Sequence, residues 1–195
     1  MFSKKPAANK TADSTDGTAA AIAAPTRLLD PETGLPNYAE FAATLRREIA
    51  RAKRYGDRSS LAVFDVRVAS FKPSNLNPKP PSPARFVAAI LTEQARESDL
   101  VGRLDTTHFA VFLTECDAAG ATAFAERTRT KLGTFVYARN EDGTGLYVRS
   151  AAGFASWDPA FTEPDYYIRA ATDHLDRQRP AYREAEREFQ ARTAS

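Results

Sequence analysis

Three short stretches of the sequence place ionisable side chains where they could do chemistry. Asp65 lies near the end of the apolar run 60–66, which predicts a strand, and a carboxylate at the end of a buried strand is a common position for a metal ligand. A carboxylate that caps the following turn is an equally favoured interpretation. Further along, the charged tetrad 96–99 ends a predicted helix, and the polar residues 105–107 separate two apolar runs. These stretches are the candidates for a binding or catalytic site.

The two apolar runs, 100–104 and 108–113, predict a β-hairpin around the polar turn. Because successive side chains of a strand point to opposite faces, the second run has two separate faces. One face carries Phe109, Val111 and Leu113, and the other carries His108, Ala110 and Phe112. Both faces are largely apolar, which predicts an interior strand whose turn lies at the end of a buried sheet.

Hydrophobic periodicity and turn residues predict the remaining elements. A helix over 38–55 should begin at Asn37 as its N-cap, and the arginines on this helix are interpreted as a solvated surface rather than a ligand site. The other expected segments are a proline-rich loop at 71–83, helices at 84–96, 118–132, 165–179 and 181–192 with Pro180 between the last two, strands at 135–138 and 146–151, and a loop at 153–164. This order predicts an α+β or α/β domain with a mixed sheet covered by helices.

Length and charge limit the class of protein. The chain has 195 residues with 27 basic and 25 acidic side chains, so its net charge of +2 predicts no nucleic-acid partner. The single cysteine, Cys116, excludes an intramolecular disulfide and fits a reducing compartment. No apolar run is long enough to span a bilayer, so we expect a cytoplasmic protein.

The two ends of the chain differ in composition from its middle. Residues 1–25 are rich in Ala, Ser, Thr, Lys and Asp and contain almost no large apolar side chain. Such a segment cannot offset the entropy of ordering, so a disordered tail is predicted there. We expect the folded domain to span residues 26–185, followed by a helix end or tail at 186–195.

Four segments, in the expected order, resemble the GGDEF domains of bacterial diguanylate cyclases over residues 28–185. Any one of them is weak evidence, but together they are strong evidence for the family fold. The segments are 30–37 (like D-x-x-T-G-L-P-N), 61–75 (like the strand and loop D-x-D-x-F-K-x-x-N), 96–113 (like R-x-S-D-L-x-x-R-L-G-G-D-E-F and an apolar strand) and 148–155 (like a strand ending in S-x-G-x-A).

The resemblance implies a fold and a reaction. The family fold is a five-stranded sheet surrounded by helices, similar to the palm of polymerases and nucleotidyl cyclases. Active members join two GTP molecules, one held by each of two domains, into cyclic di-GMP. In that reaction metal ions assist the attack of a ribose 3′-hydroxyl on an α-phosphate.

This chain departs from the family at its signature, Gly-Gly-Asp/Glu-Glu-Phe. The corresponding positions are Asp105, Thr106, Thr107, His108 and Phe109. The lost glycines would have let the backbone approach a substrate closely, and a threonine hydroxyl is a poor Mg²⁺ ligand. Arg67 also stands where the family has the second acid of D-x-D. These departures predict a domain with no catalytic residues, no resident metal and no cyclase activity.

Some positions of the family's GTP site keep a matching residue type. They are Asp65, Lys72, Asn75, Arg179 and Arg183. The resemblance makes them a candidate residual nucleotide and metal site, with Mg²⁺ expected only if GTP binds. Ordinary surface charge is the alternative interpretation for the three basic residues.

The tetrad 96–99 matches the R-x-x-D motif through which family members bind their product. The resemblance implies that Arg96 and Asp99 contact cyclic di-GMP, helped by Arg127 from the following helix. The planar donors of a guanidinium suit guanine or phosphate oxygens, and a carboxylate can accept from guanine N–H groups. Alternatively, Arg96 and Asp99 form an ion pair at a helix end that contributes about 0.2–0.5 kcal/mol.

Three functions remain open. The favoured one is a regulator that binds cyclic di-GMP through Arg96, Asp99 and Arg127 without catalysis, with a homodimer formed on ligand binding. The second is a scaffold that binds an unidentified protein partner and no nucleotide, through the arginines of residues 46–54 or the C-terminal helix. The third is a residual cyclase or GTP-binding regulator.

Overall fold

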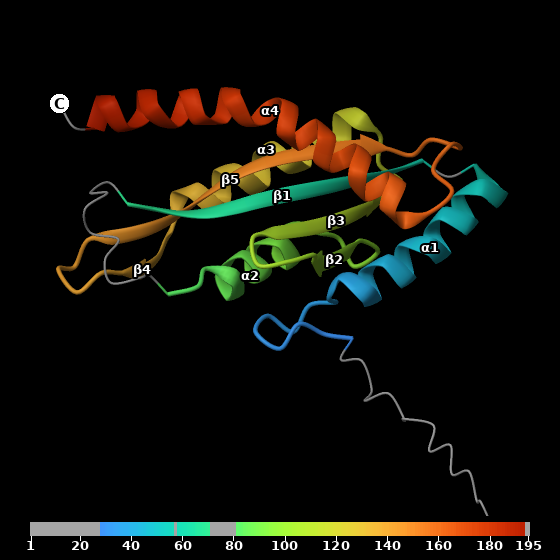
Figure 1. Ribbon diagram of the computed structural model, residues 1–195, viewed down its shortest axis with the longest axis horizontal. Coiled ribbons are helices and arrows are strands. Elements are labelled where there is room, and N and C mark those ends of the chain that lie inside the picture. Colours follow the sequence, from blue (N-terminus) through green and yellow to red (C-terminus); the bar gives the residue numbers. More distant parts are fainter. Residues whose placement is uncertain (1–27, 57, 71–80, 194–195) are drawn as a thin grey trace, which may run out of the picture.

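The computed structural model describes residues 28–56, 58–70 and 81–193 (Figure 1). The predictions for the N-terminal tail, Lys72 and Asn75 lie outside the described residues. Within them, four helices surround one five-stranded sheet. The α+β fold expected from the resemblance is therefore confirmed.

Every pairing between the described strands is antiparallel, so the prediction of a mixed sheet is wrong. The strands β1 (Ser59–Ser70), β2 (Leu100–Arg103), β3 (His108–Thr114), β4 (Val136–Arg139) and β5 (Gly145–Ser156) lie in the order β2-β3-β1-β5-β4. The helical connection between β1 and β2 makes these two strands parallel to each other. They are not neighbours, because the β2–β3 hairpin places β3 between them, so neighbouring strands run in opposite directions.

A layer of helices covers each face of the sheet. Helices α1 (Tyr38–Tyr55) and α4 (Pro164–Thr193) pack on one face, and α2 (Ala84–Gln94) and α3 (Ala118–Thr134) pack on the other. No helix in the described ranges combines the length and the apolar character needed to cross a bilayer.

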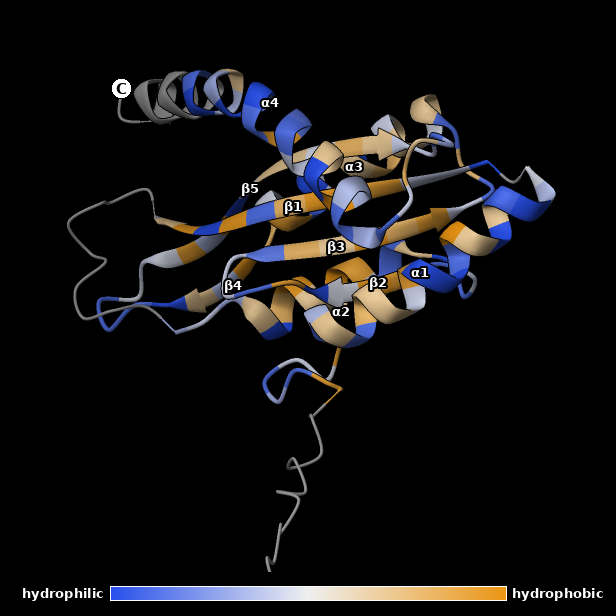
Figure 2. Cartoon of the chain, turned by 45° about the vertical axis from the view of Figure 1, so that its right-hand side comes forward, coloured by the Kyte–Doolittle hydropathy of each residue, from blue (hydrophilic) through white to orange (hydrophobic). Residues whose placement is uncertain are grey.

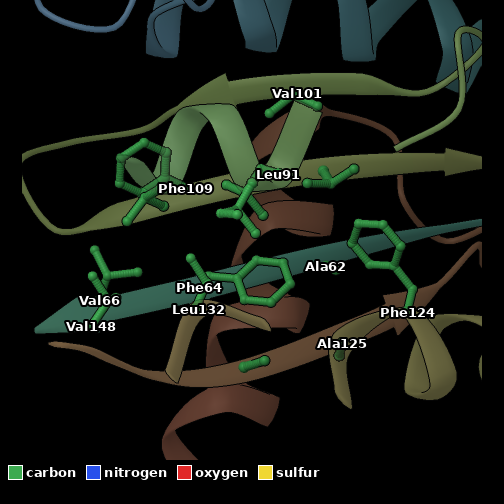
Figure 3. Close-up of a cluster of buried hydrophobic side chains, with 14 of the residues drawn as sticks. Ala62, Phe64, Val66, Leu91, Val101, Phe109, Phe124, Ala125, Leu132 and Val148 are labelled. Carbon is green, nitrogen blue, oxygen red and sulfur yellow. The ribbon is translucent and has the colours of Figure 1, made fainter. Parts of the chain in front are cut away.

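Alternating side chains of β1 supply a core on each side of the sheet. Phe64 belongs to the core under α2 and α3, where it lies among apolar residues that include Leu91, Phe109 and Phe124 (Figure 3). Val63 belongs to the core under α1 and α4. Apolar colouring follows the strands, whereas α1 shows much polar surface on its outer side (Figure 2).

Two local predictions are confirmed. The side-chain Oδ1 of Asn37 accepts from the backbone N–H of Glu40 at 3.1 Å, which makes Asn37 the N-cap of α1. Strand β3 lies between β2 and β1 and is buried on both faces, as its two apolar faces predict.

Three element boundaries differ from the prediction. Strand β1 continues to Ser70, so Asp65 lies within a strand and not at its end. Strand β5 continues to Ser156 because it pairs with β1 along almost its whole length. Helix α4 continues through Pro180. The proline removes the N–H donor for the carbonyl of Asp176, and because Asp176 is exposed, water can satisfy that carbonyl.

Gly153 lets α4 approach β5 closely. A Cβ atom at this position would overlap the backbone of α4 at Leu175 and Ala171. The glycine of the S-x-G-x-A segment therefore has a packing role, because it seats the helix that carries Arg179 and Arg183.

Candidate functional site

Arg103, the last residue of β2, organises the turn that replaces the family signature. The side chain is 9% exposed, and its Nη1 donates to the carboxylates of Asp30 at 2.9 Å and Glu32 at 2.6 Å. Its Nε and Nη2 donate to the backbone carbonyls of Asp105 and Thr106 at 3.0 and 3.3 Å. Burial opposes the charge, but the bonds to Glu32 and Asp30 outweigh it and raise the pKa of Arg103. A buried cation thus fixes two turn carbonyls.

Asp105 closes the same turn from within. Its Oδ1 accepts from the backbone N–H groups of Thr107 and His108, both at 2.8 Å, and its Oδ2 lies 2.9 Å from Nδ1 of His108. Burial acts to raise the pKa of Asp105, but the two backbone bonds outweigh it and the pKa is lowered. The carboxylate of the turn is therefore already bonded through both oxygens.

Residues 30–37, which resemble the opening motif of the family, fold against Arg103. The backbone N–H and the hydroxyl of Thr33 donate to Asp30 Oδ2 at 2.8 and 2.6 Å. Gly34 has a φ of 74°, in the left-handed region that favours glycine. The backbone N–H of Arg103 donates to the carbonyl of Pro36 at 2.9 Å. In this chain the motif supports the turn.

Asp65 is held by two arginines. The residue is 2% exposed, and its Oδ2 accepts from Arg179 Nη1 at 2.6 Å and from Arg67 Nη2 at 3.1 Å. Its Oδ1 is buried and has no hydrogen-bond partner among the described residues. The β1–β3 register places His108 directly opposite Asp65. The carboxylate is thus neutralised by α4 and by its own strand.

A divalent metal ion does not fit these residues. Mg²⁺ prefers several oxygen ligands in an octahedral set, whereas Asp65 is the single acid among the lining residues of this site and its Oδ2 is already bonded to two guanidinium groups. Arg67 brings a positive charge to the position of the family's second acid. In the part of the chain that the structure describes, no group of three or more His, Cys, Asp or Glu side chains comes together that could hold a metal ion.

A pocket of about 490 Å³ is lined by Asp65 of β1 and by residues of β5, α3 and α4. Strand β4 pairs with β5 only between Gly145 and Tyr147, so α3 and α4 reach the remaining edge. We name this the arginine pocket. Its charged and polar lining residues are Asp65, Arg67, Arg129, Arg149, Ser150, Arg179, Tyr182 and Arg183.

Side chains from α3 and α4 close the open edge of β5. Arg129 Nε donates to the carbonyl of Ser150 at 3.0 Å, and the Tyr182 hydroxyl donates to the carbonyl of Ala152 at 3.4 Å. The Tyr182 ring lies 3.8 Å from the Arg129 guanidinium carbon. Burial raises the pKa of Tyr182 although the Arg129 charge opposes this, so the hydroxyl keeps its proton and donates.

Arg96, Asp99 and Arg127 line a second pocket of about 230 Å³, which we name the RxxD pocket. Asp99 Oδ2 accepts from the backbone N–H of Arg96 at 2.8 Å, and Asp99 Oδ1 accepts from the backbone N–H of Thr114 at 3.0 Å. The exposed Arg96 guanidinium forms no hydrogen bond or ion pair within the described residues. The alternative prediction of an Arg96–Asp99 ion pair is therefore wrong, because backbone N–H groups orient the carboxylate.

The far wall of the RxxD pocket comes from α3. Arg127 Nε donates to Gln94 Oε1 at 2.9 Å, and its guanidinium carbon lies 5.4 Å from the centre of the Phe124 ring. Cys116 lines the same pocket. Burial and the nearby Asp117 raise the pKa of its thiol, which therefore stays protonated near neutral pH.

The structure groups the predicted site residues into two sets. Arg96, Asp99 and Arg127 share the RxxD pocket, while Asp65, Arg179 and Arg183 share the arginine pocket.

The sequence analysis missed several residues of the arginine pocket. Arg129, Arg149 and Tyr182 belong to no motif that marks them. The one usable signal is the strand register, which pairs Arg149 directly with Arg67 across β5 and β1. That register depends on β5 being longer than its apolar pattern indicates.

A family model described as diguanylate cyclase, GGDEF domain, matches residues 85–185, which is more than half of the chain. The chain belongs to the GGDEF domain family. The matched region contains the RxxD pocket residues and the altered signature at 105–109, whereas Asp65 precedes it.

One relative and two solved structures illustrate the similarity. Diguanylate cyclase DgcP from Pseudomonas aeruginosa is 28% identical over 134 residues, which are 67% of this chain and 19% of that protein. The GGDEF domain of DgcB from Caulobacter crescentus, in complex with c-di-GMP, gives a TM-score of 0.67 at 20% identity and covers 80% of this chain and 91% of that chain. Diguanylate cyclase SiaD from Pseudomonas aeruginosa, in complex with its activator SiaC, gives 0.68 at 26% identity and covers 80% and 59%.

This chain thus spans about a fifth of the length of DgcP. The DgcB comparison establishes the fold alone, since its identity is low.

Proposed function

We propose that this GGDEF domain is a catalytically inactive regulator that binds cyclic di-GMP in the RxxD pocket. The observation that carries the proposal is the Arg96 guanidinium, which lies at a pocket beside an oriented carboxylate and pairs with no described residue. Such a guanidinium is available to a phosphate or guanine oxygen. Asp99 Oδ2 makes one bond to the protein and keeps a lone-pair site for a guanine N–H.

The contacts of the altered turn support catalytic inactivity. Asp105 bonds its own turn, and Asp65 is paired with Arg67 and Arg179. The joining of two GTP molecules needs carboxylate-bound metal ions to balance the triphosphate charge, and the residues present do not fit such ions. Incubation with GTP and Mg²⁺ or Mn²⁺ should yield no cyclic di-GMP, and formation of product would contradict the proposal.

The size of the RxxD pocket supports ligand-dependent dimerisation. At about 230 Å³ it is smaller than the range of roughly 300–1,000 Å³ that encloses a drug-sized ligand. Cyclic di-GMP bound there would project from the surface and could contact a second copy of the domain. Light scattering should therefore show a larger mass in the presence of cyclic di-GMP. An unchanged mass at saturating ligand would exclude a dimer that the ligand holds together.

A regulator of this kind needs a protein that responds to its ligand state. SiaD was crystallised with its activator SiaC, which is a precedent for a protein partner within the family. A pull-down with and without cyclic di-GMP would search for such a partner. Capture of the same partner with and without cyclic di-GMP, by Arg96→Ala as well as by the wild type, would instead favour a scaffold that needs no nucleotide.

Calorimetric titration with cyclic di-GMP tests the proposal. The wild type should give saturable heat, and Arg96→Ala should bind at least about tenfold more weakly, because a charge-assisted hydrogen bond is lost. Arg177→Ala is the matched control, since Arg177 is exposed on α4 and lines neither pocket. Absence of heat at tens of micromolar ligand, or an unaffected Arg96→Ala variant, would refute binding at this site.

A further inference from the structure

The two arginines of the RxxD pocket are held in different ways. The Arg96 guanidinium is exposed and makes no bond to a described residue. The Arg127 guanidinium is held from two sides, because its Nε donates to Gln94 Oε1 at 2.9 Å and its central carbon lies 5.4 Å from the centre of the Phe124 ring. Gln94 is the last residue of α2 and itself lines the pocket. The pocket therefore combines one free cation with one cation that is held in place.

The chemistry of the Arg127–Gln94 bond fixes the orientation of the Gln94 amide. A guanidinium has only N–H donors, so the atom of Gln94 that faces Arg127 Nε must be the carbonyl oxygen. The Nη hydrogens of Arg127 make no hydrogen bond or ion pair within the described residues. The Nη groups form a donor fork that matches phosphate or guanine oxygens. The bond to Gln94 thus holds Arg127 and leaves this fork available to a ligand.

An arginine that is already held loses less freedom when a ligand binds. Ordering one long, freely rotating side chain on binding lowers the affinity by about twofold to tenfold. Arg96 bears this cost, because nothing in the described residues holds its guanidinium. Arg127 has given up part of its freedom before the ligand arrives, because Gln94 and Phe124 already hold it.

We propose that Gln94 is a positioning residue of the RxxD pocket, which raises the affinity for cyclic di-GMP by holding Arg127 in place before the ligand binds. This inference rests on the proposed function, because it concerns the same pocket and the same ligand. It extends the site to a residue outside the R-x-x-D motif, two positions before Arg96 on the preceding helix. Gln94 acts through Arg127, and its own contact with the ligand is not required.

A second contact between the same two helices separates positioning from helix packing. Glu93, the residue before Gln94 on α2, accepts from Lys131 Nζ on α3 at 2.5 Å. Neither Glu93 nor Lys131 lines the RxxD pocket. Loss of this ion pair weakens the contact between α2 and α3 without removing a bond to Arg127. Glu93→Met is therefore the matched control for Gln94→Met, because each variant loses one side-chain contact to α3.

Calorimetric titration of the full chain with cyclic di-GMP, arranged as a double-mutant cycle, tests the inference. Gln94→Met keeps a long unbranched side chain but removes the carbonyl acceptor, and it should weaken binding by about fivefold. In an Arg127→Ala background the same substitution should change the affinity by less than about twofold, because the residue that Gln94 positions is gone. Glu93→Met should also bind within about twofold of the wild type.

A spectroscopic measurement on the free protein reports the same bond. In the wild type and in Glu93→Met, the Arg127 Nε–H should give a slowly exchanging NMR signal, because a hydrogen-bonded N–H is protected from exchange with water. Gln94→Met should lose this signal. Retention of the signal in Gln94→Met would show that Gln94 does not hold Arg127 and would overturn the inference.

The titrations distinguish failure of this inference from failure of the proposed function. Wild-type affinity in Gln94→Met, beside weak binding by Arg96→Ala, would keep the site and overturn the positioning role. An equal loss in Glu93→Met, or a full fivefold loss in the Arg127→Ala background, would overturn it as well, because Gln94 would then act without Arg127. Absence of heat from the wild type would overturn the proposed function and this inference together. Circular dichroism of each variant would confirm that it folds.

Discussion

The altered turn and the RxxD pocket lie within one stretch of sequence, residues 96–113, and treat their charges in opposite ways. In the turn, Arg103 is buried and bonded to two carboxylates and two carbonyls. In the pocket, Arg96 is exposed and makes no bond to a described residue. A charge whose partners are all internal supports the fold, whereas a charge that lacks them is available to a ligand.

The residues that replace the family signature are bonded within the turn. Asp105 and His108 do not leave a gap where glycines and acids once stood, because they bond each other and the turn backbone. The turn is therefore a stable structural element. The four predictions that follow test this division between structure and ligand binding, and they run from the largest expected effect on stability to the smallest.

Arg103→Met should destabilise the protein most. The substitution leaves Asp30 and Glu32 without their cation and frees two turn carbonyls. Breaking a buried ion pair by removing one partner costs about 3 kcal/mol or more. Urea denaturation monitored by circular dichroism would measure the change. A loss of unfolding free energy below about 1 kcal/mol would show that these contacts of Arg103 stabilise the protein no more than a solvent-exposed ion pair does.

Asp99→Ala should destabilise the protein by an intermediate amount. Its carboxylate holds the backbone N–H groups of Arg96 and Thr114, and loss of hydrogen bonds to a charged group costs about 1–3 kcal/mol. The same variant should bind cyclic di-GMP more weakly. Asp99→Asn keeps one carbonyl acceptor and should recover part of the stability in the same denaturation experiment. Identical stability of the two variants would contradict this dual role.

Acid should weaken the turn. The pKa of Asp105 is lowered by the N–H groups of Thr107 and His108, and that of Asp30 by Thr33 and Arg103, in both cases against the effect of burial. A carboxyl with a lowered folded-state pKa stabilises the protein above its unfolded-state pKa and loses this contribution as pH falls.

Unfolding free energies measured at a series of pH values would test this expectation. Wild-type stability should fall below about pH 4. Asp105→Asn should flatten the decline, and Arg96→Ala should follow the wild-type curve. If the stability of Asp105→Asn falls with pH as steeply as that of the wild type, the Asp105 carboxyl does not contribute to the loss of stability in acid.

Arg96→Ala should change stability least, by less than about 0.5 kcal/mol, as for a surface substitution away from structural contacts. Its guanidinium is exposed and unpaired within the described residues. Denaturation of this variant beside Arg103→Met gives the contrast directly. A loss comparable to that of Arg103→Met would reveal a structural role and remove the basis for assigning Arg96 to a ligand.

Local patterns in the sequence predicted the parts of the fold that depend on local chemistry. The hairpin follows from two apolar runs around a polar break, and the start of α1 follows from the capping side chain of Asn37. Family motifs grouped Arg96 with Asp99 and Arg127, and these three side chains line one pocket of the structure.

The arginine pocket could not be predicted in the same way. Asp65 looked like a strand end because the apolar run stops after it, yet pairing with β5 extends β1 to Ser70. Arg129 and Arg149 line the same pocket only because α3 reaches the open edge of β5. Such contacts depend on strand register and helix placement, which no short motif encodes.

Titration of cyclic di-GMP into the wild type, Arg96→Ala and Arg183→Gln tests the central claim most directly. If the RxxD pocket is the site, the wild type and Arg183→Gln will give the same saturable heat, and Arg96→Ala will bind at least about tenfold more weakly. Undiminished binding by Arg96→Ala, with loss of binding by Arg183→Gln, would place the ligand in the arginine pocket and contradict the account.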